Sequence, residues 1–258
     1  VPVGQHLTLR TKVLTALNFY GYGSYQLNIG QNCNQSVSQS SVSKAICQIT
    51  DALNTPEIFN RYVQFPRNIN ELQRLRNEFY RKYQFPGVIG CINCTHIAIY
   101  PPQSDDPLYP EHLYVNRKGY HSINTQLICD ANLKILNVCA RYPGSSHDTF
   151  IWNNSNVQTY MRNLHEHGHR SYFLLGDSGY PLRSYLLTPC NDAAPGTPEE
   201  RYNISQKRTK RCNGGVLKLR FRCLLKHRML HYPPERASKI INAVVVLHNM
   251  CIDANLPN

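Results

Sequence analysis

Two short stretches of the chain combine the apolar character of a buried strand with side chains suited to metal chemistry. In 174-LLGDSGY-180 the carboxylate of Asp177 directly follows an apolar run and lies between glycines. A carboxylate at the carboxyl end of a strand is well placed to hold a divalent cation, because hard cations prefer oxygen ligands. An Asp in this setting also suits a turn or the cap of a following helix. The stretch alone therefore predicts either a metal ligand or a turn residue.

The second stretch, 88-VIGCINCTHIAIYPP-102, is a strand-like run interrupted by Asn93. The amide oxygen of Asn can touch a cation, but it brings no negative charge. Cys91 and Cys94 form a C-x-x-C, yet residues three apart in a strand point to opposite faces, so we expect no shared zinc ion. His96 is predicted to be a core or supporting histidine and not a ligand. Ten cysteines are spread along the chain, which favours reduced, mostly buried thiols in a nuclear or cytosolic protein.

Positive charge is concentrated in one part of the chain. The formal net charge is +12, and residues 201–239 hold twelve Lys and Arg against one acidic residue, Glu235. A solvated helix face usually mixes both signs, so this segment favours a phosphate-rich partner such as DNA. The candidate DNA-binding cations of this segment are Lys207, Arg208, Lys210, Arg211, Lys218, Arg220 and Arg222. A loop at 116–121 is also basic and is a further candidate for phosphate contact.

The first 85 residues are predicted to be helical. In the first helix, Val13, Leu14 and Leu17 lie on one face, and in 38–54 the apolar residues follow the spacing of a helical core stripe. The opposite face of 38–54 carries Ser, Gln and Lys, which is typical of the recognition helix of a helix-turn-helix and also of many small helical bundles. The candidate DNA-contacting residues on that face are Gln39, Ser40, Ser43 and Lys44.

From Val88 the pattern changes to strands. Runs at 88–100, 121–131 and 134–143 predict three antiparallel strands, the last two joined as a hairpin with Asp130 in the turn. A helix is expected from Ser145, a further strand at 171–181, and helices at 216–232 and 235–253. The chain is thus predicted to be α/β, or α+β. A helical, helix-turn-helix-like region with its linker would occupy residues 1–85, and a domain with a mixed sheet residues 86–258.

Several long segments, taken together, resemble the Harbinger transposase-derived nuclease family of the RNase H-like DDE superfamily. The resemblance rests on VIGCINCTHIAI, YVNRKGYHSINTQLICDANLKILNV, RYPGSSHDTFIW, LLGDSGYP and the run from VLKLRFRC to HNMCI. It implies an RNase H-like mixed sheet flanked by helices, with metal-dependent phosphodiester hydrolysis of DNA. Two Asp and one Glu would hold Mg²⁺ or Mn²⁺.

Carried onto this chain, the resemblance gives a different answer for each carboxylate. Asp177 matches the second Asp, whereas Asn93 stands at the position of the first. The Glu is not found, because the segment before 214-GGVLK-218 is shorter than the family pattern around Thr209 and Arg211. A mis-set exon boundary can also shorten a segment, but it does not explain Asn93. Asp148, in 145-SSHD-148, is expected to have a structural role or to support the site.

These observations leave two main hypotheses about function. One is an endonuclease of the family's type whose catalysis is impaired in this copy. The alternative is a non-catalytic protein that binds DNA or a partner, and the resemblance implies a Myb-like protein as that partner. The expected location is the nucleus, the cytoplasm or both. No apolar run is long enough for a membrane span, and no targeting signal is recognisable at the start, although the chain begins at Val and an earlier segment is left open.

Overall fold

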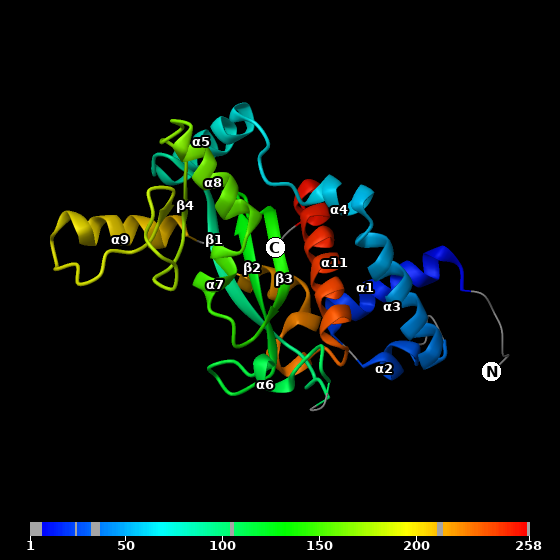
Figure 1. Cartoon of the computed structure of the whole chain (residues 1–258). Helices are drawn as coiled ribbons and strands as arrows, with labels where there is room; N and C mark the ends of the chain where they lie inside the picture. Colours follow the sequence, from blue (N-terminus) through cyan, green and yellow to red (C-terminus); the bar gives the residue numbers. More distant parts are fainter. Residues whose placement is uncertain (1–6, 24, 32–36, 104–105, 211–213, 257–258) are drawn as a thin grey trace.

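A mixed five-stranded sheet lies at the centre of the molecule (Figure 1). The computed structural model describes residues 7–23, 25–31, 37–103, 106–210 and 214–256. The strand order is β3-β2-β1-β4-β5, which confirms the predicted RNase H-like mixed sheet. The strands are β1 (Val88–Ala98), β2 (Ser122–Cys129), β3 (Ile135–Pro143), β4 (Phe173–Leu175) and β5 (Leu186–Leu187). Strand β2 is antiparallel to both β1 and β3, whereas β4 is parallel to β1 and β5 is parallel to β4.

The hairpin between β2 and β3 forms where the sequence predicts it. The carboxylate of Asp130 accepts hydrogen bonds from the backbone amides of Asn132, at 2.8 Å, and Lys134, at 2.9 Å. Leu133 closes the turn with a φ of 69°, a left-handed conformation. Asp130 is therefore a turn residue, as expected, because a short carboxylate can satisfy nearby backbone donors.

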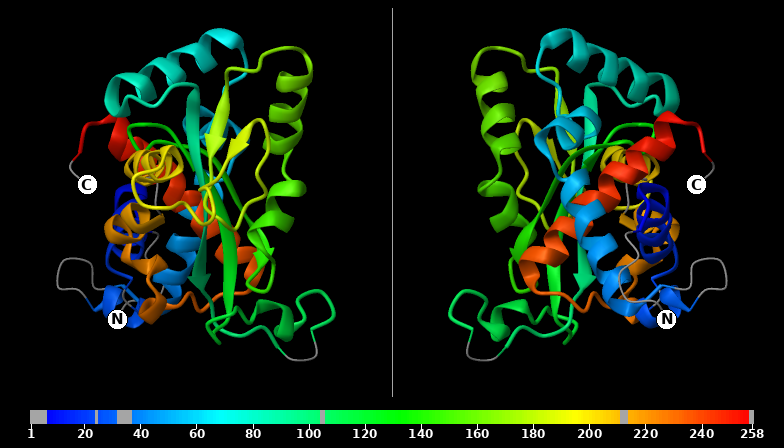
Figure 2. Two further views of the ribbon diagram at one scale, coloured as in Figure 1. Left: turned by 90° about the vertical axis from the view of Figure 1, so that its left-hand side faces the viewer. Right: turned by 90° about the vertical axis from the view of Figure 1, so that its right-hand side faces the viewer.

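Helices cover both faces of the sheet (Figure 2). On one face lie α11 (Pro234–Asp253), α10 (Gly214–Arg220) and the N-terminal helices. On the other face lie α7 (Asp148–Asn153), α8 (Asn156–Glu166) and part of α5 (Ile69–Tyr83). Alternation along β1 divides its side chains between the two layers, so that Cys91 and Ile97 join the first core and Ile92 joins the second. Ile89 also joins the second core, beside the register shift between Val88 and Gly90.

The N-terminal helices are α1 (Leu9–Tyr22), α2 (Gln26–Gly30), α3 (Gln39–Leu53) and α4 (Pro56–Tyr62). The predicted stripe of α3 is confirmed, since Val42, Ile46 and Leu53 are buried. The predicted core face of α1 is wrong. Leu14 and Leu17 are 45% and 39% exposed, whereas Ala16, Phe19 and Tyr20 are buried. The large aromatic rings pack against α3 and the segment after α10 in place of the leucines.

The basic segment differs from the predicted pair of long helices. Glu199 and Glu200 were expected to lie in a loop, but they belong to a helix, α9 (Pro198–Thr209). Pro198 is at its start and the Thr197 side chain caps it. The helix expected over 216–232 ends at Arg220, and two short 3₁₀ turns follow, η1 (Arg222–Leu224) and η2 (Lys226–Arg228). Only α11 keeps the length expected of it, because it alone is buried along its core face over five turns.

A short helix, the start of α7 and the state of the cysteines also bear on the predictions. A short helix α6 (Glu111–Tyr114) lies between β1 and β2. The helix expected from Ser145 begins instead at Asp148, with His147 as its N-cap residue. Cys129 is disulfide-bonded, contrary to the expectation of reduced thiols, whereas seven other described cysteines are free.

Candidate functional site at the end of strands β1 and β4

Strands β1 and β4 bring Asn93 level with Asp177. In the parallel ladder Cys91 pairs with Leu175, and both residues of interest follow two positions later. Because side chains alternate along a strand, Asn93 lies on the same face of β1 as Cys91, whereas Asp177 follows the end of β4 at Leu175. Both side chains are half-buried. The register thus puts the two positions that the sequence singled out at the same end of the β1–β4 pair.

Asp148 approaches the same place from the start of α7. Its Oδ1 accepts a hydrogen bond from the side-chain amide of Asn124, on β2, at 3.0 Å. Its Oδ2 lies 3.4 Å from the position that a Cβ on Gly179 would take, and Oδ1 of Asp177 lies 3.1 Å from that point. Two carboxylates therefore converge at Gly179. From the sequence Asp148 was expected to have a structural or supporting role; it begins α7, five residues after the end of β3.

Asp148 does not take the place of a carboxylate at position 93. Its partner Asn124 is paired in the ladder with His96, and strand alternation puts His96 on the face opposite Asn93. On that face, the Sγ of Cys94 lies 3.1 Å from the hydroxyl of Tyr180. Burial, together with the charge of Asp148, raises the pKa of the Cys94 thiol, so the thiol stays protonated at neutral pH and is not a nucleophile.

Lys210 forms an ion pair with Asp177. Its Nζ lies 3.3 Å from Oδ2 of Asp177, and the lysine side chain is only 14% exposed. The end of α9 fixes this geometry, because the buried amide of Gln206 donates to the carbonyl of Gly176 at 3.1 Å. The backbone amide of Lys210 in turn donates to the carbonyl of Gln206 at 2.7 Å. The ammonium group therefore lies beside the carboxylate that follows β4.

No glutamate of α9 reaches this point. Glu199 and Glu200 are in the first turn of the helix, and Glu200 accepts a hydrogen bond from the backbone amide of Gly196. Ten residues separate Glu200 from Lys210, which along a helix corresponds to about 15 Å. Their position in a helix corrects the expected loop, and it leaves them at the wrong end to join Asp177.

Comparison with known proteins shows the family of this chain. Residues 92–249, which include Asn93, Asp148, Asp177 and Lys210, match a family described as DDE superfamily endonuclease. The chain belongs to the DDE superfamily endonucleases. The resemblance noted from the sequence segments is thereby confirmed.

Its similarity to individual proteins extends beyond that domain. It is 36% identical to the Homo sapiens protein named "Putative nuclease HARBI1" over 94% of this chain and 67% of the relative. It is 25% identical to "Protein ALP1-like" of Arabidopsis thaliana over 97% of this chain and 62% of that protein. A crystal structure of the Mos1 mariner paired end complex with Mn covers 99% of this chain and 79% of its own, at 14% identity and a TM-score of 0.31. That score is too low to support any conclusion about this molecule.

Membership of the DDE superfamily implies divalent metal, but the residues present do not fit a two-metal centre. Such a centre needs anionic oxygens that bridge or flank two cations. The part of the chain that the structure describes contains no group of three His, Cys, Asp or Glu able to hold an ion. Asp177 faces the ammonium group of Lys210, and Asn93 supplies an amide where a carboxylate would be required. We therefore assign no metal-dependent step to this site.

The predicted DNA-contacting residues differ in the exposure of their side chains and in the contacts that these side chains make. Six have exposed side chains: Gln39, Ser40, Lys44, Lys207, Arg208 and Arg222. Ser43 is half-buried, Arg211 lies outside the described residues, and three cations make intramolecular contacts: Lys210, Lys218 and Arg220.

Lys218 is half-buried and contacts strand β1. Its Nζ donates to the carbonyl of His96 at 2.7 Å, and burial lowers its pKa to about 8, with Lys118 contributing. Nδ1 of His96 lies 3.0 Å from Oγ of Ser122. Burial also lowers the pKa of His96. The lowered pKa favours the neutral form of His96, and its contact with Ser122 ties β1 to β2.

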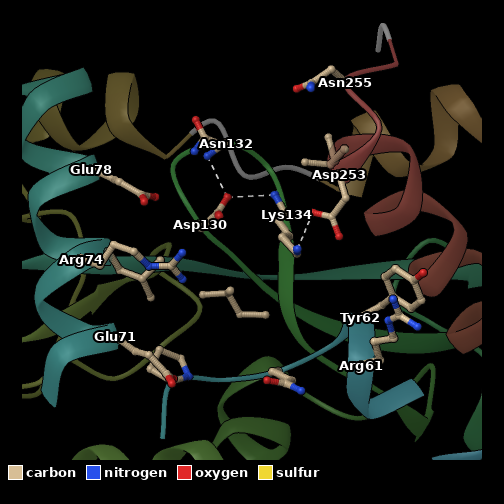
Figure 3. A pocket seen from close by; sticks show the side chains of 15 residues that line it. Arg61, Tyr62, Glu71, Arg74, Glu78, Asp130, Asn132, Lys134, Asp253 and Asn255 are labelled. Atoms are coloured by element: carbon tan, nitrogen blue, oxygen red, sulfur yellow. Dashed lines mark hydrogen bonds and ion pairs between the residues drawn. The ribbon is translucent and has the colours of Figure 1, made fainter. Parts of the chain in front are cut away.

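A polar cavity of about 730 Å³ lies away from these residues (Figure 3). It is enclosed by α4, α5, the β2–β3 turn and the end of α11, and Asp130 and Lys134 line it. Burial raises the pKa of Asp130, whose hydrogen bonds to backbone amides oppose the shift. Lys134 is paired with Asp253. Since its acidic and basic side chains largely balance one another, the cavity shows no preference for an ion of either sign.

Proposed function

We propose that this chain is a DNA-binding member of the DDE superfamily endonucleases in which phosphodiester hydrolysis is impaired. The observation that carries the proposal is the ion pair between Lys210 and Asp177 beside Asn93. An ammonium group at 3.3 Å already balances the charge of Asp177, which lowers the attraction of that carboxylate for a second cation. An amide at position 93 adds no compensating negative charge.

The expected cost to catalysis is large. Two-metal hydrolysis depends on ligands that hold the cations against both the attacking and the leaving oxygen. Loss of two of three such carboxylates is expected to raise the barrier by at least several kcal/mol, which corresponds to about a thousandfold or more in rate.

Binding to DNA does not depend on those carboxylates. Lys207, Arg208 and Arg222 are exposed and belong to a segment, residues 201–234, that contains no acidic residue. Lys and Arg that neutralise phosphates supply most of the affinity for DNA irrespective of its sequence. A DNA-binding role therefore persists when hydrolysis is lost.

A plasmid nicking assay with Mg²⁺ or Mn²⁺ tests the catalytic part of this proposal. The unmodified chain is expected to nick supercoiled DNA no faster than Asp177→Ala. Metal binding is followed in parallel as the rise in unfolding temperature with added Mn²⁺, and the expected rise for the unmodified chain is negligible. Asn93→Asp combined with Lys210→Met and a restored Glu should gain both responses.

The control for that experiment is Lys207→Met, which removes a cation from the same helix without touching Asp177. It should gain neither nicking nor metal stabilisation. Nicking by the unmodified chain that Asp177→Ala abolishes would show that the impairment proposal is wrong.

A partner-binding role is the second candidate, and the exposed leucines of α1 favour it. Leu14 and Leu17 are 45% and 39% exposed on one helix face. By the family resemblance, a Myb-like protein is the proposed partner. Binding that is independent of salt, in a chain without affinity for DNA, would support this role over the first.

The nucleus, the cytoplasm or both remain the proposed location, and imaging of a tagged chain tests it. No helix of the described residues is long and apolar enough to cross a bilayer.

A further inference from the structure

A second cavity has a volume of about 530 Å³, and neither Asp148 nor Asp177 lines it. We call it the aromatic groove. It opens between the α1–α2 turn, the start of α3 and the segment that follows η1, and Figure 2 shows the blue helices beside the orange segment. Its walls include Tyr25, Gln39, Arg228 and His231. Of these four residues, Gln39 alone was among the DNA contacts predicted from the sequence.

Aromatic rings line one edge of the groove and remain open to solvent. The ring of His231 stacks on that of Tyr100 with centroids 5.3 Å apart and an angle of 28°. Tyr25 contacts the same His231 edge to face, at 6.0 Å. Tyr25 and Tyr100 are 64% and 57% exposed. Exposed aromatic faces of this kind are the platforms on which proteins stack unpaired bases.

The charge of the groove suits a phosphate backbone. None of the described residues that line it is Asp or Glu, whereas Arg228 and His227 are exposed there. Arg222 and Lys226 follow on the same short stretch of chain, and the Nζ of Lys226 lies 4.5 Å from the centroid of the Tyr120 ring. Positive charge along an aromatic platform is the combination that binds single strands, since the cations follow the backbone and the rings receive the bases.

We infer that the aromatic groove binds an unpaired segment of DNA, with bases stacked on Tyr25 and on the pair formed by His231 and Tyr100. Paired bases in a duplex are stacked on one another and do not present their faces to these rings. Gln39, at the start of α3, lines the groove as well as the exposed face proposed for DNA. The groove therefore continues from that face, and the inference rests on the proposed DNA binding.

The apolar side chains of the groove are few compared with a protein-docking surface. Leu27 and Met229, 52% and 42% exposed, lie among the rings and cations. A protein partner would need a larger apolar area to form a stable complex. We therefore assign the groove to nucleic acid and leave a protein occupant as an outcome of the test.

Fluorescence anisotropy with two labelled probes tests the inference: an oligothymidine strand and a hairpin duplex. Tyr25→Ala combined with His231→Ala should weaken binding of the single strand by about tenfold or more, since a stacked base contributes about 1–3 kcal/mol. Binding of the duplex should change by less than about twofold. Tyr25→Phe combined with His231→Phe keeps the ring faces and should bind the single strand as the unmodified chain does.

The control is Tyr80→Ala, which removes a ring that is 52% exposed on α5, outside the groove. It should leave both affinities unchanged. If the double alanine variant binds the single strand normally, or binds both probes equally weakly, the assignment of the groove is wrong while the proposed DNA binding stands. If the unmodified chain binds neither probe, the proposed function fails first, and a protein occupant replaces DNA.

Discussion

Buried positive charge is the distinctive chemistry of this chain at the scale of single residues. Lys210 is balanced by Asp177, but Lys218 has no carboxylate against it among its described contacts and relies on the carbonyl of His96. Burying a cation without a counter-charge disfavours the protonated form, which is why the pKa of Lys218 falls to about 8. The two lysines therefore respond to pH in different ways.

Lys218 predicts a dependence of stability on pH. Between pH 8 and about 10 the unfolded chain keeps this proton and the folded chain releases it, so the free energy of unfolding contributed by Lys218 rises with pH. Relative to Lys218→Met, the unmodified chain should therefore gain stability across this range. Urea unfolding at pH 7.5, 8.5 and 9.5 measures the difference.

The free energy of unfolding must be compared with that of Lys218→Met at each pH, because buried thiols change the stability of the chain in the opposite direction as pH rises. Burial raises the pKa of Cys91 to about 12, so such groups lower stability as pH rises above 9. Lys207→Met, a change at an exposed lysine, is the control and should show no pH-dependent difference. A constant difference between Lys218→Met and the unmodified chain would contradict the assignment.

The sequence predicted part of the site and missed another part for a clear reason. Asn93 and Asp177 are conspicuous in the sequence because each interrupts or ends an apolar strand, and the family resemblance assigned both to the site. The contact of Lys210 with Asp177 could not be predicted, since it depends on a helix, α9, that the sequence was expected to leave as a loop. Asp148 was undervalued because the proximity of α7 to Gly179 is a property of the folded chain.

At the scale of elements, α11 fastens the hairpin and the N-terminal helices to the sheet. The side chain of Asn249 is fully buried and makes three hydrogen bonds. It donates to the carbonyls of Tyr62, at 2.8 Å, and Ile135, at 2.7 Å, and accepts from the amide of Ile135 at 2.8 Å. A single amide thus joins α4, β3 and α11.

Replacement of Asn249 by Ala should destabilise the chain strongly. The buried amide and carbonyl of Ile135 and the partly buried carbonyl of Tyr62 would lose these hydrogen bonds. Each unsatisfied buried group costs about 1–3 kcal/mol, so a destabilisation of about 3 kcal/mol is expected. Asn242→Ala, a half-buried change on the same helix, should cost less than about 1 kcal/mol. Chemical denaturation measures both, and equal effects would show that the hydrogen bonds of Asn249 carry no special stability.

The elements themselves were predictable where burial is periodic and long. Strands β1 to β3 and helices α3, α5 and α11 match the expectations because each has one continuous apolar pattern. The segment after Arg220 was predicted as helix, but Phe221, Cys223 and Leu224 are buried in tight 3₁₀ turns. Apolar residues at such close spacing do not distinguish a helix from a packed turn until their surroundings are known.

At the scale of the whole molecule, one hydrophobic core joins the two ends of the chain. It contains Tyr20 of α1, Ile46 of α3, Cys91 of β1 and Val244 of α11. The boundary predicted between residues 85 and 86 stays a prediction, but this shared core leads us to expect one cooperative unfolding transition. Fluorescence of Trp152, the single tryptophan, and circular dichroism should report the same midpoint.

Two separate midpoints would contradict that expectation. The comparison is informative because Trp152 belongs to the core on the opposite face of the sheet from the N-terminal helices. A variant that weakens the N-terminal packing, Tyr20→Ala, should lower both midpoints equally if the chain unfolds as a unit.

Salt dependence of DNA binding also belongs to the whole molecule, since it reflects how many phosphates the protein neutralises. Replacement of Lys207, Arg208 and Arg222 by Ala should reduce the slope of log affinity against log salt by about 0.9 for each phosphate that is no longer neutralised. A charge-matched variant at exposed arginines elsewhere, Arg81, Arg162 and Arg170, should keep the slope. Titrations from about 50 to 200 mM salt distinguish the two, and an unchanged slope in the first variant would contradict the role given to the basic segment.

Asn93, Asp148 and Asp177 are each only half-buried. Changes at these polar positions are therefore expected to disturb the buried packing less than changes within the two hydrophobic cores. In evolutionary terms, selection for a stable protein and selection for bond cleavage act on separate sets of positions. A gene of this kind can lose one activity and acquire another while every intermediate sequence still encodes a folded protein.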